Sequence, residues 1–317
     1  MRGRVLQDEG WRPAREADRR WRNLVAFFKR MESDEVAGAA LLVRFKNRQT
    51  ETVSDGQGYF SAEMEPEPLD AGVWQEIDLQ LVENPSVTAK AQVLVPPTDA
   101  EFGVISDIDD TVVYSNVTRK VRMVLALALS NARTRKPFEG VAAFYQALHR
   151  GRNPLFYVSK SPWNLYAPLV EFLELQGLPS GPLLLRDFGW RMPKDHKQES
   201  IAHILETYPA MKFILIGDSG EQDPEIYSDM VRRFPERIRV IYIRSVVEDA
   251  RRIGAIRGLV EEVAKTGCQL VLTPDSEAAA AHAAAEGLID PAALPLVRAA
   301  KLADARAPRT APPPAAR

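Results

Sequence analysis

The chain has 317 residues, of which 45% are hydrophobic and 26% charged, as in a soluble globular protein long enough for two domains. The formal net charge of −2 gives no overall attraction to nucleic acid, so contact with a membrane or polyanion would need a local basic patch. The single cysteine, Cys268, excludes an intrachain disulfide framework and a thiolate metal cluster. The N-terminus lacks the apolar core of a signal peptide and no run approaches a membrane span, so we expect a cytoplasmic protein.

Residues 1–99 have the pattern of a β-rich domain. Apolar side chains alternate with polar ones over 41–45, 77–81 and 89–95, as expected of half-buried strands. Between these stretches, Asp55-Gly56-Gln57-Gly58 is typical of a turn that leads into a further strand. We therefore predict a small β-sandwich-like domain.

One helical pattern interrupts this domain. Its apolar face comprises Trp21, Leu24, Val25, Phe28 and Met31, and basic residues surround that face. We favour a helix that packs on the sandwich with a solvated basic rim, because amphipathic helices usually face a core. The alternative is an interfacial anchor for anionic lipid, and with it a peripheral contact with the membrane.

After Pro96-Pro97 the pattern changes to short apolar strands that alternate with helical stretches. The predicted strands are 102–106, 155–158, 183–185, 213–216, 240–243 and 270–272. Near-continuous apolar strands separated by helices predict an α/β domain over 100–290, with a doubly wound parallel sheet. From 291 to 317 the chain is rich in Ala and Pro, and we expect a disordered tail.

Polar side chains follow four of these strands. Asp107 and Asp109 come at the end of the first strand, Ser159 follows the second, Lys194 and Lys197 precede a helix, and Asp218 and Asp223 follow the strand at 213–216. The carboxyl ends of parallel strands meet at one edge of the sheet, where open α/β folds bind their ligands. The sequence therefore predicts one site made from all four segments.

These residue types suit the hydrolysis of a phosphate ester. Asp107 can attack phosphorus to form an aspartyl-phosphate, and Asp109 can give the leaving group a proton and later activate water. Ser159 can donate a hydrogen bond to the phosphoryl group, and Lys197 can stabilise its growing negative charge. Carboxylate oxygens suit Mg²⁺, and the predicted metal ligands are Asp107, Asp109, Asp218 and Asp223.

The same residues carry a resemblance to a known superfamily. Asp107-x-Asp109-x-Thr111, Ser159, Lys197 and Gly217-Asp218-x₄-Asp223 resemble the four motifs of the haloacid dehalogenase phosphohydrolases. More narrowly, the segments around these motifs, over about 100–290, are similar to the actin-patch phosphatidate phosphatases. The resemblance implies an Mg²⁺-dependent enzyme of lipid metabolism that converts phosphatidate to diacylglycerol.

Some alternatives stay open at the level of sequence. Lys194 competes with Lys197 as the catalytic lysine, and Ser161 competes with Ser159. The substrate could instead be a soluble phosphomonoester, with the same chemistry. In a third, non-enzymatic hypothesis the N-terminal β domain is the functional part and binds a protein or carbohydrate.

A helical segment after the first motif bears on the substrate. Residues 117–129 are apolar over most of the expected helix and have basic residues at one end. In this superfamily an insertion at this point forms a cap over the site. As a cap, the segment would meet lipid headgroups and acyl chains; the alternative is a helix packed on the sheet, and the pattern does not separate the two.

Overall fold

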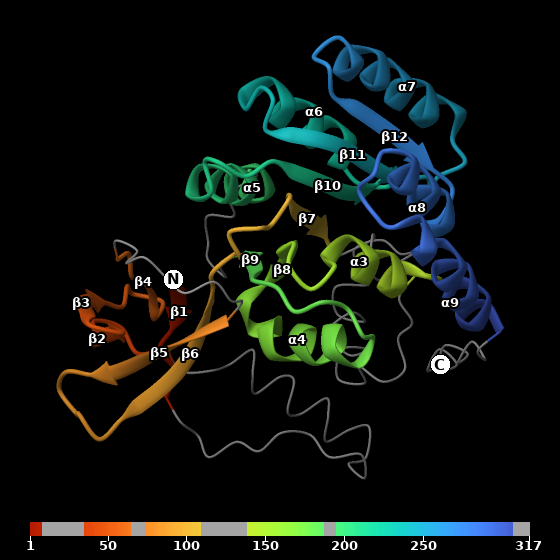
Figure 1. Ribbon diagram of the computed structural model, residues 1–317. Coiled ribbons are helices and arrows are strands. Elements are labelled where there is room, and N and C mark those ends of the chain that lie inside the picture. Colours follow the sequence, from red (N-terminus) through yellow and green to blue (C-terminus); the bar gives the residue numbers. More distant parts are fainter. Residues whose placement is uncertain (8–34, 65–73, 109–137, 187–194, 307–317) are drawn as a thin grey trace, which may run out of the picture. The chain divides into compact units, whose positions relative to one another are not determined.

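A computed structural model of the chain describes residues 1–7, 35–64, 74–108, 138–186 and 195–306. The described residues form two compact units, one up to Asp99 and the other from Ala100 onward (Figure 1). The predicted helices at 21–31 and 117–129 lie outside the described residues, as do Asp109 and Lys194.

The N-terminal unit contains two antiparallel sheets. A four-stranded sheet has the order β3-β2-β5-β6, and β1 pairs with β4 in a separate two-stranded sheet. The strands are β1 (Arg2–Arg4), β2 (Ala40–Phe45), β3 (Arg48–Val53), β4 (Tyr59–Ser61), β5 (Trp74–Leu81) and β6 (Thr88–Leu94). Val43 and Ile77 are buried together with Ala62, which follows β4, so the alternation in the sequence does mark one apolar face.

The second unit is built on a six-stranded sheet. Its order is β12-β11-β10-β7-β8-β9, and every neighbouring pair is parallel. The strands are β7 (Gly103–Asp107), β8 (Leu155–Pro162), β9 (Leu183–Arg186), β10 (Phe213–Asp218), β11 (Ile238–Arg244) and β12 (Gln269–Thr273). All residues of β7 and β10 are buried, as expected for strands covered on both faces. The predicted doubly wound parallel sheet is confirmed.

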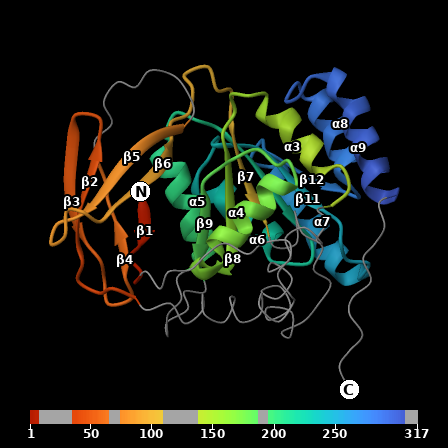
Figure 2. The ribbon, with the colours of Figure 1, turned by 90° about the horizontal axis from the view of Figure 1, so that it is seen from below.

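Helices cover both faces of this sheet (Figures 1 and 2). They are α3 (Val141–His149), α4 (Tyr166–Leu175), α5 (His196–Thr207), α6 (Asp223–Arg233), α7 (Ala250–Ala264), α8 (Ser276–Ala285) and α9 (Leu294–Arg306), with short 3-10 turns η2 (Trp163–Leu165) and η3 (Pro291–Ala293). Helix α6 contacts both α5 and α7, whereas α3, α8 and α9 form a second contacting group. Over the described residues, no helix combines the length and apolar character needed to cross a membrane.

The end of the chain differs from the predicted disordered tail. Residues 291–306 form η3 and α9, and only 307–317 lie outside the described residues. The Asp290 side chain accepts a hydrogen bond from the Ala292 amide at 2.9 Å and so caps the first turn. Val297 is fully buried, and the Asp304 carboxylate accepts a hydrogen bond from the Gly140 amide at 2.8 Å. These contacts fix the segment to the domain. Its Ala-rich composition favours a helix, since alanine has the highest helix propensity.

Candidate active site

Asp107 ends the strand β7, which lies between β10 and β8 in the sheet. Its side chain is completely buried. The preceding residue, Ser106, uses its hydroxyl to bond both the Asp107 carbonyl, at 2.8 Å, and the Tyr145 hydroxyl, at 2.7 Å. These bonds hold the end of β7 against helix α3, so the Asp107 carboxylate is presented from a fixed backbone.

Lys197 supplies the cation next to this carboxylate. It lies in the first turn of α5, is almost fully buried, and places its Nζ 2.9 Å from Asp107 Oδ1. The same ammonium group forms a short ion pair with Asp223. Burial alone would lower the pKa of Lys197, but the charges of Asp107 and Asp223 raise it well above its usual value. The lysine is therefore charged throughout the neutral range.

Asp223 begins helix α6, five residues after the end of β10. Its carboxylate accepts a hydrogen bond from the Asp218 amide at 3.2 Å, in addition to the ion pair with Lys197. Burial raises the pKa of Asp223, and Lys197 opposes that rise. A Cβ atom at Gly217 would collide with the Asp223 carboxylate, so the glycine of the Gly-Asp motif is needed for this close approach.

Asp218 organises the loop between β10 and α6. Its Oδ1 accepts hydrogen bonds from the amides of Gly220, at 2.6 Å, and Glu221, at 3.2 Å. This is the side-chain-to-backbone pattern with which aspartate stabilises a tight turn. The predicted metal ligand Asp218 is thus buried at the expected strand end, where one of its oxygens shapes the turn that carries Glu221.

Glu221 is the site residue that the sequence did not single out. Its Oε2 lies 2.7 Å from Lys160 Nζ and 3.7 Å from Lys197 Nζ. Partial burial opposes its ionisation, but the two lysines lower the pKa of Glu221 below its usual value. Glu221 is one of the four unspecified positions of the Gly217-Asp218-x₄-Asp223 motif, and its spacing does not indicate that its side chain turns toward Asp107.

Arg252 of helix α7 fixes the same loop from outside. Its guanidinium donates hydrogen bonds to the carbonyl oxygens of Ser219, at 3.0 Å, and Glu221, at 2.5 Å. The same group forms an ion pair with Glu225 of α6. The backbone of Glu221 is therefore held at its amide by Asp218 and at its carbonyl by Arg252.

The two candidate serines lie together on β8. Both are buried, and the Ser161 amide donates a hydrogen bond to Ser159 Oγ at 3.0 Å. Ser159 follows Val158, the residue that pairs with Asp107 across the sheet, so it lies nearer the end of β7. The register therefore brings Ser159 closer than Ser161 to Asp107 along the sheet, and the choice between the two serines stays a prediction.

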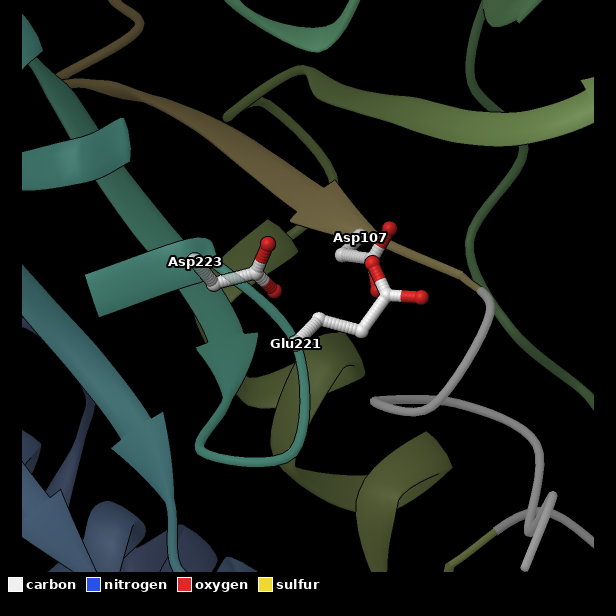
Figure 3. A group of neighbouring side chains, drawn as sticks. All are labelled: Asp107, Glu221 and Asp223. Carbon is white, nitrogen blue, oxygen red and sulfur yellow. The ribbon is translucent and has the colours of Figure 1, made fainter. Parts of the chain in front are cut away.

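Three carboxylates in this site can together hold a metal ion. One oxygen each from Asp107, Glu221 and Asp223 lies within 4.8 Å of the others (Figure 3). Asp218 adds a fourth carboxylate, and Lys160 and Lys197 supply positive charge to the same group of side chains. An all-oxygen donor set of this kind fits a hard divalent cation. Asp109, the remaining predicted ligand, lies outside the described residues.

The parallel sheet and the charged groups at its carboxyl edge define the class of this domain. A buried aspartate ends the central strand, a lysine from a later helix pairs with it, and a further aspartate follows the neighbouring strand. This arrangement is similar to the one expected from the motifs that resemble the haloacid dehalogenase phosphohydrolases.

The match to a family narrows this class. Residues 102–245 match the family model described as phosphatidate phosphatase APP1, catalytic domain. Over 151 residues the chain is 35% identical to phosphatidate phosphatase APP1 of Saccharomyces cerevisiae, which covers 45% of this chain and 26% of the yeast protein. It is also 35% identical over 166 residues to an uncharacterized protein of Schizosaccharomyces pombe, covering 49% of this chain and 27% of that protein. The resemblance predicted from the motifs is confirmed, although the chain spans about a quarter of the length of these curated relatives.

Solved structures show more distant similarity. A haloacid dehalogenase family hydrolase from Deinococcus radiodurans, with bound phosphate and sodium, aligns with 61% of this chain and 100% of its own at 18% identity and a TM-score of 0.35. Phosphoserine phosphatase from T. onnurineus aligns with 59% of this chain and 96% of its own at 14% identity and a TM-score of 0.33.

Proposed function

We propose that this chain is an Mg²⁺-dependent phosphatase that hydrolyses phosphatidate to diacylglycerol and phosphate. The observation that carries the proposal is the pairing of Lys197 with Asp107 and Asp223 inside the segment that matches the APP1 catalytic domain. The same pairing supports a mechanism in which Asp107 becomes phosphorylated during the reaction.

In the first step an Asp107 carboxylate oxygen attacks phosphorus, and the bond between phosphorus and the leaving alcohol oxygen breaks. Asp109 gives its proton to that oxygen. Lys197, with its Nζ 2.9 Å from Asp107 Oδ1, orients the attacking carboxylate and stabilises the negative charge that spreads over the phosphoryl oxygens. Ser159 donates a hydrogen bond to one of these oxygens.

In the second step water attacks phosphorus of the aspartyl-phosphate. Asp109 takes a proton from this water, and the bond between phosphorus and the Asp107 oxygen breaks. Phosphate leaves, and both aspartates return to their starting protonation states. Since Asp107 is completely buried and fixed at a strand end, the nucleophile is returned to the same position for the next cycle.

The magnesium ion would be held by Asp107 and Asp223, with Asp109 and Asp218 as further predicted ligands. When bound, it supplies positive charge that reduces the repulsion between the phosphate ester and the attacking carboxylate. Asp107 and Asp223 each have an oxygen in the group of carboxylate oxygens that lie within 4.8 Å of one another, which supports this assignment.

The test measures phosphate release from phosphatidate vesicles and from a soluble aryl phosphate, with Mg²⁺ and with EDTA. We expect Mg²⁺-dependent release from the vesicles, and Asp107→Asn should lower it by at least about 10³-fold because an amide is not a nucleophile. Asp229→Asn, which alters an exposed carboxylate on α6, is the matched control and should stay active. Hydrolysis of soluble esters without any of phosphatidate would overturn the lipid assignment, and full activity in Asp107→Asn would overturn the nucleophile.

A further inference from the structure

The Glu221 side chain lies between two lysines that come from different elements. Its Oε2 is 2.7 Å from Lys160 Nζ, on β8, and 3.7 Å from Lys197 Nζ, on α5. Figure 3 shows the side chain extending from the loop after β10 toward Asp107 at the tip of β7. One carboxylate oxygen is thus shared by two cations close to the nucleophile.

The backbone of Glu221 is held by its neighbours, whereas its side chain is partly exposed. Its amide is bound by the Asp218 carboxylate and its carbonyl by Arg252, at 3.2 and 2.5 Å. The side chain is 22% exposed, whereas those of Asp107 and Asp223 are 0% exposed. Rotation about the side-chain bonds can therefore carry the carboxylate outward without a change in the loop.

We propose that the Glu221 carboxylate occupies the place of the substrate's phosphoryl group before substrate binds, and that the phosphate displaces it. This inference rests on the proposed function, because attack by Asp107 defines that place. A phosphorus under attack lies about 3–3.5 Å from the attacking oxygen, and its other oxygens extend toward the nearest cation. That cation is Lys197, 2.9 Å from Asp107 Oδ1. Glu221 has an oxygen within 4.8 Å of one on Asp107 and 3.7 Å from the same lysine, so the two anions would compete for the same cation beside the nucleophile.

The exchange of anions is favourable because a phosphomonoester carries more charge than a carboxylate. Its charge-assisted hydrogen bonds to Lys160 and Lys197 replace the ion pairs of Glu221, and the displaced carboxylate returns to water. The same competition acts on the product, since Glu221 can return to the two lysines as inorganic phosphate leaves. Glu221 thus weakens retention of phosphate and lowers product inhibition.

The experiment titrates inorganic phosphate into the full chain by calorimetry, once with EDTA and once with Mg²⁺. We expect Glu221→Gln to bind phosphate roughly three- to tenfold more tightly than the wild type. The substitution removes the carboxylate that competes with phosphate for the two lysines, and an ion pair of a partly exposed side chain contributes only modestly to the free energy. Glu277→Gln is the matched control, since Glu277 is also a carboxylate shared by two cations, Arg298 and Lys301, at 2.6 and 3.0 Å. Lys160→Met should weaken phosphate binding. If the Glu221→Gln variant does not fold, Glu221→Asp is the second variant. Its side chain is one methylene shorter, so its carboxylate lies farther from the lysines and the affinity for phosphate should also rise.

Kinetics provide the second readout. With a soluble aryl phosphate, Glu221→Gln should lower KM and the inhibition constant of phosphate by a similar factor, while kcat changes less. If Glu221 were instead a metal ligand or a structural support, phosphate affinity would stay the same or fall, and more Mg²⁺ would be needed for half-maximal activity. That result, or no phosphate binding by any variant, overturns the displacement of Glu221. Tighter phosphate binding in a chain that hydrolyses no ester would overturn the proposed function, and only the competition between Glu221 and phosphate for the two lysines would stand.

Discussion

At the scale of single residues, the ammonium group of Lys197 has two roles. It neutralises Asp107 and Asp223, whose side chains are completely buried, and it holds the first of them in position for attack. Removing one partner of a buried ion pair leaves a buried charge without its partner. The resulting loss in the free energy of unfolding is much larger than the contribution of an exposed ion pair. Stability and activity should therefore both depend on this lysine, in ways that variants can separate.

We expect Lys197→Met to lower the free energy of unfolding by about 3–5 kcal/mol and to abolish phosphatase activity. Adding Asp223→Asn removes one of the two stranded charges, so the double variant should regain part of the stability and none of the activity. Urea unfolding and phosphate release measure the two effects. Lys194→Met serves as the control for the competing lysine; loss of activity there, with activity kept in Lys197→Met, would show the assignment to be wrong.

Much of this site could be predicted from the sequence, because strand ends fix the backbone position of a residue. Asp107 and Asp223 follow strands, Lys197 is predicted at the start of a helix, and the structure brings the three side chains together. Glu221 could not be found, because it lies inside a loop whose course depends on the Asp218 carboxylate bonding the amides of Gly220 and Glu221. Sequence spacing does not indicate which side chain of such a loop points inward.

At the scale of elements, alternating and continuous apolar patterns predict the strands well, but the composition of the C-terminal segment does not predict its structure. The predicted strands of the parallel sheet all formed, because each is a buried run bounded by turn residues. In the N-terminal unit β3 (Arg48–Val53) was missed because it is an edge strand with mostly polar and exposed side chains. The sequence does not predict helix α9 because Ala and Pro suggest disorder, whereas the position of the helix depends on contacts with α8 and with α3, which is distant in sequence.

Helix α9 is joined to α8 by an ionic contact that should respond to acid. Lys301 Nζ lies 2.7 Å from Asp275 Oδ2 and 3.0 Å from Glu277 Oε2. Burial opposes ionisation of Asp275, but the hydrogen bond from Lys301 brings the pKa of Asp275 below its usual value of 3.8. A depressed pKa in the folded state gives stability that is complete above the unfolded value and is lost as the pH falls through the folded one.

Lys301→Met should therefore lower the melting temperature by about 1–3 °C at pH 7, as expected for partly exposed ion pairs. The difference from wild type should shrink below pH 4 as Asp275 and Glu277 take up protons. Melting curves of both proteins from pH 7 to pH 3 measure it, with Lys265→Met at the exposed end of α7 as the control. A difference that stays constant over this range would mean that Lys301 acts through packing of its aliphatic chain.

At the scale of the whole molecule, the chain contains two units with separate cores. The N-terminal unit has its own antiparallel sheets and buried cluster, and every described residue of the candidate active site belongs to the second unit. The match to the APP1 catalytic domain also lies entirely in the second unit, at 102–245. Catalysis and the role of residues 1–99 can therefore be tested apart.

We expect a chain that starts at residue 100 to fold and to hydrolyse a soluble aryl phosphate within about twofold of the full chain, since a unit with its own core folds by itself. Asp107→Asn in the shortened chain controls for contaminating phosphatases. Phosphatidate vesicles give the informative comparison. Loss of vesicle hydrolysis alone would assign residues 1–99 to the encounter with lipid, because the chemical step would still be intact. Loss of both activities in a folded chain would mean that the N-terminal unit contributes to the active site, contrary to the division proposed from the sequence.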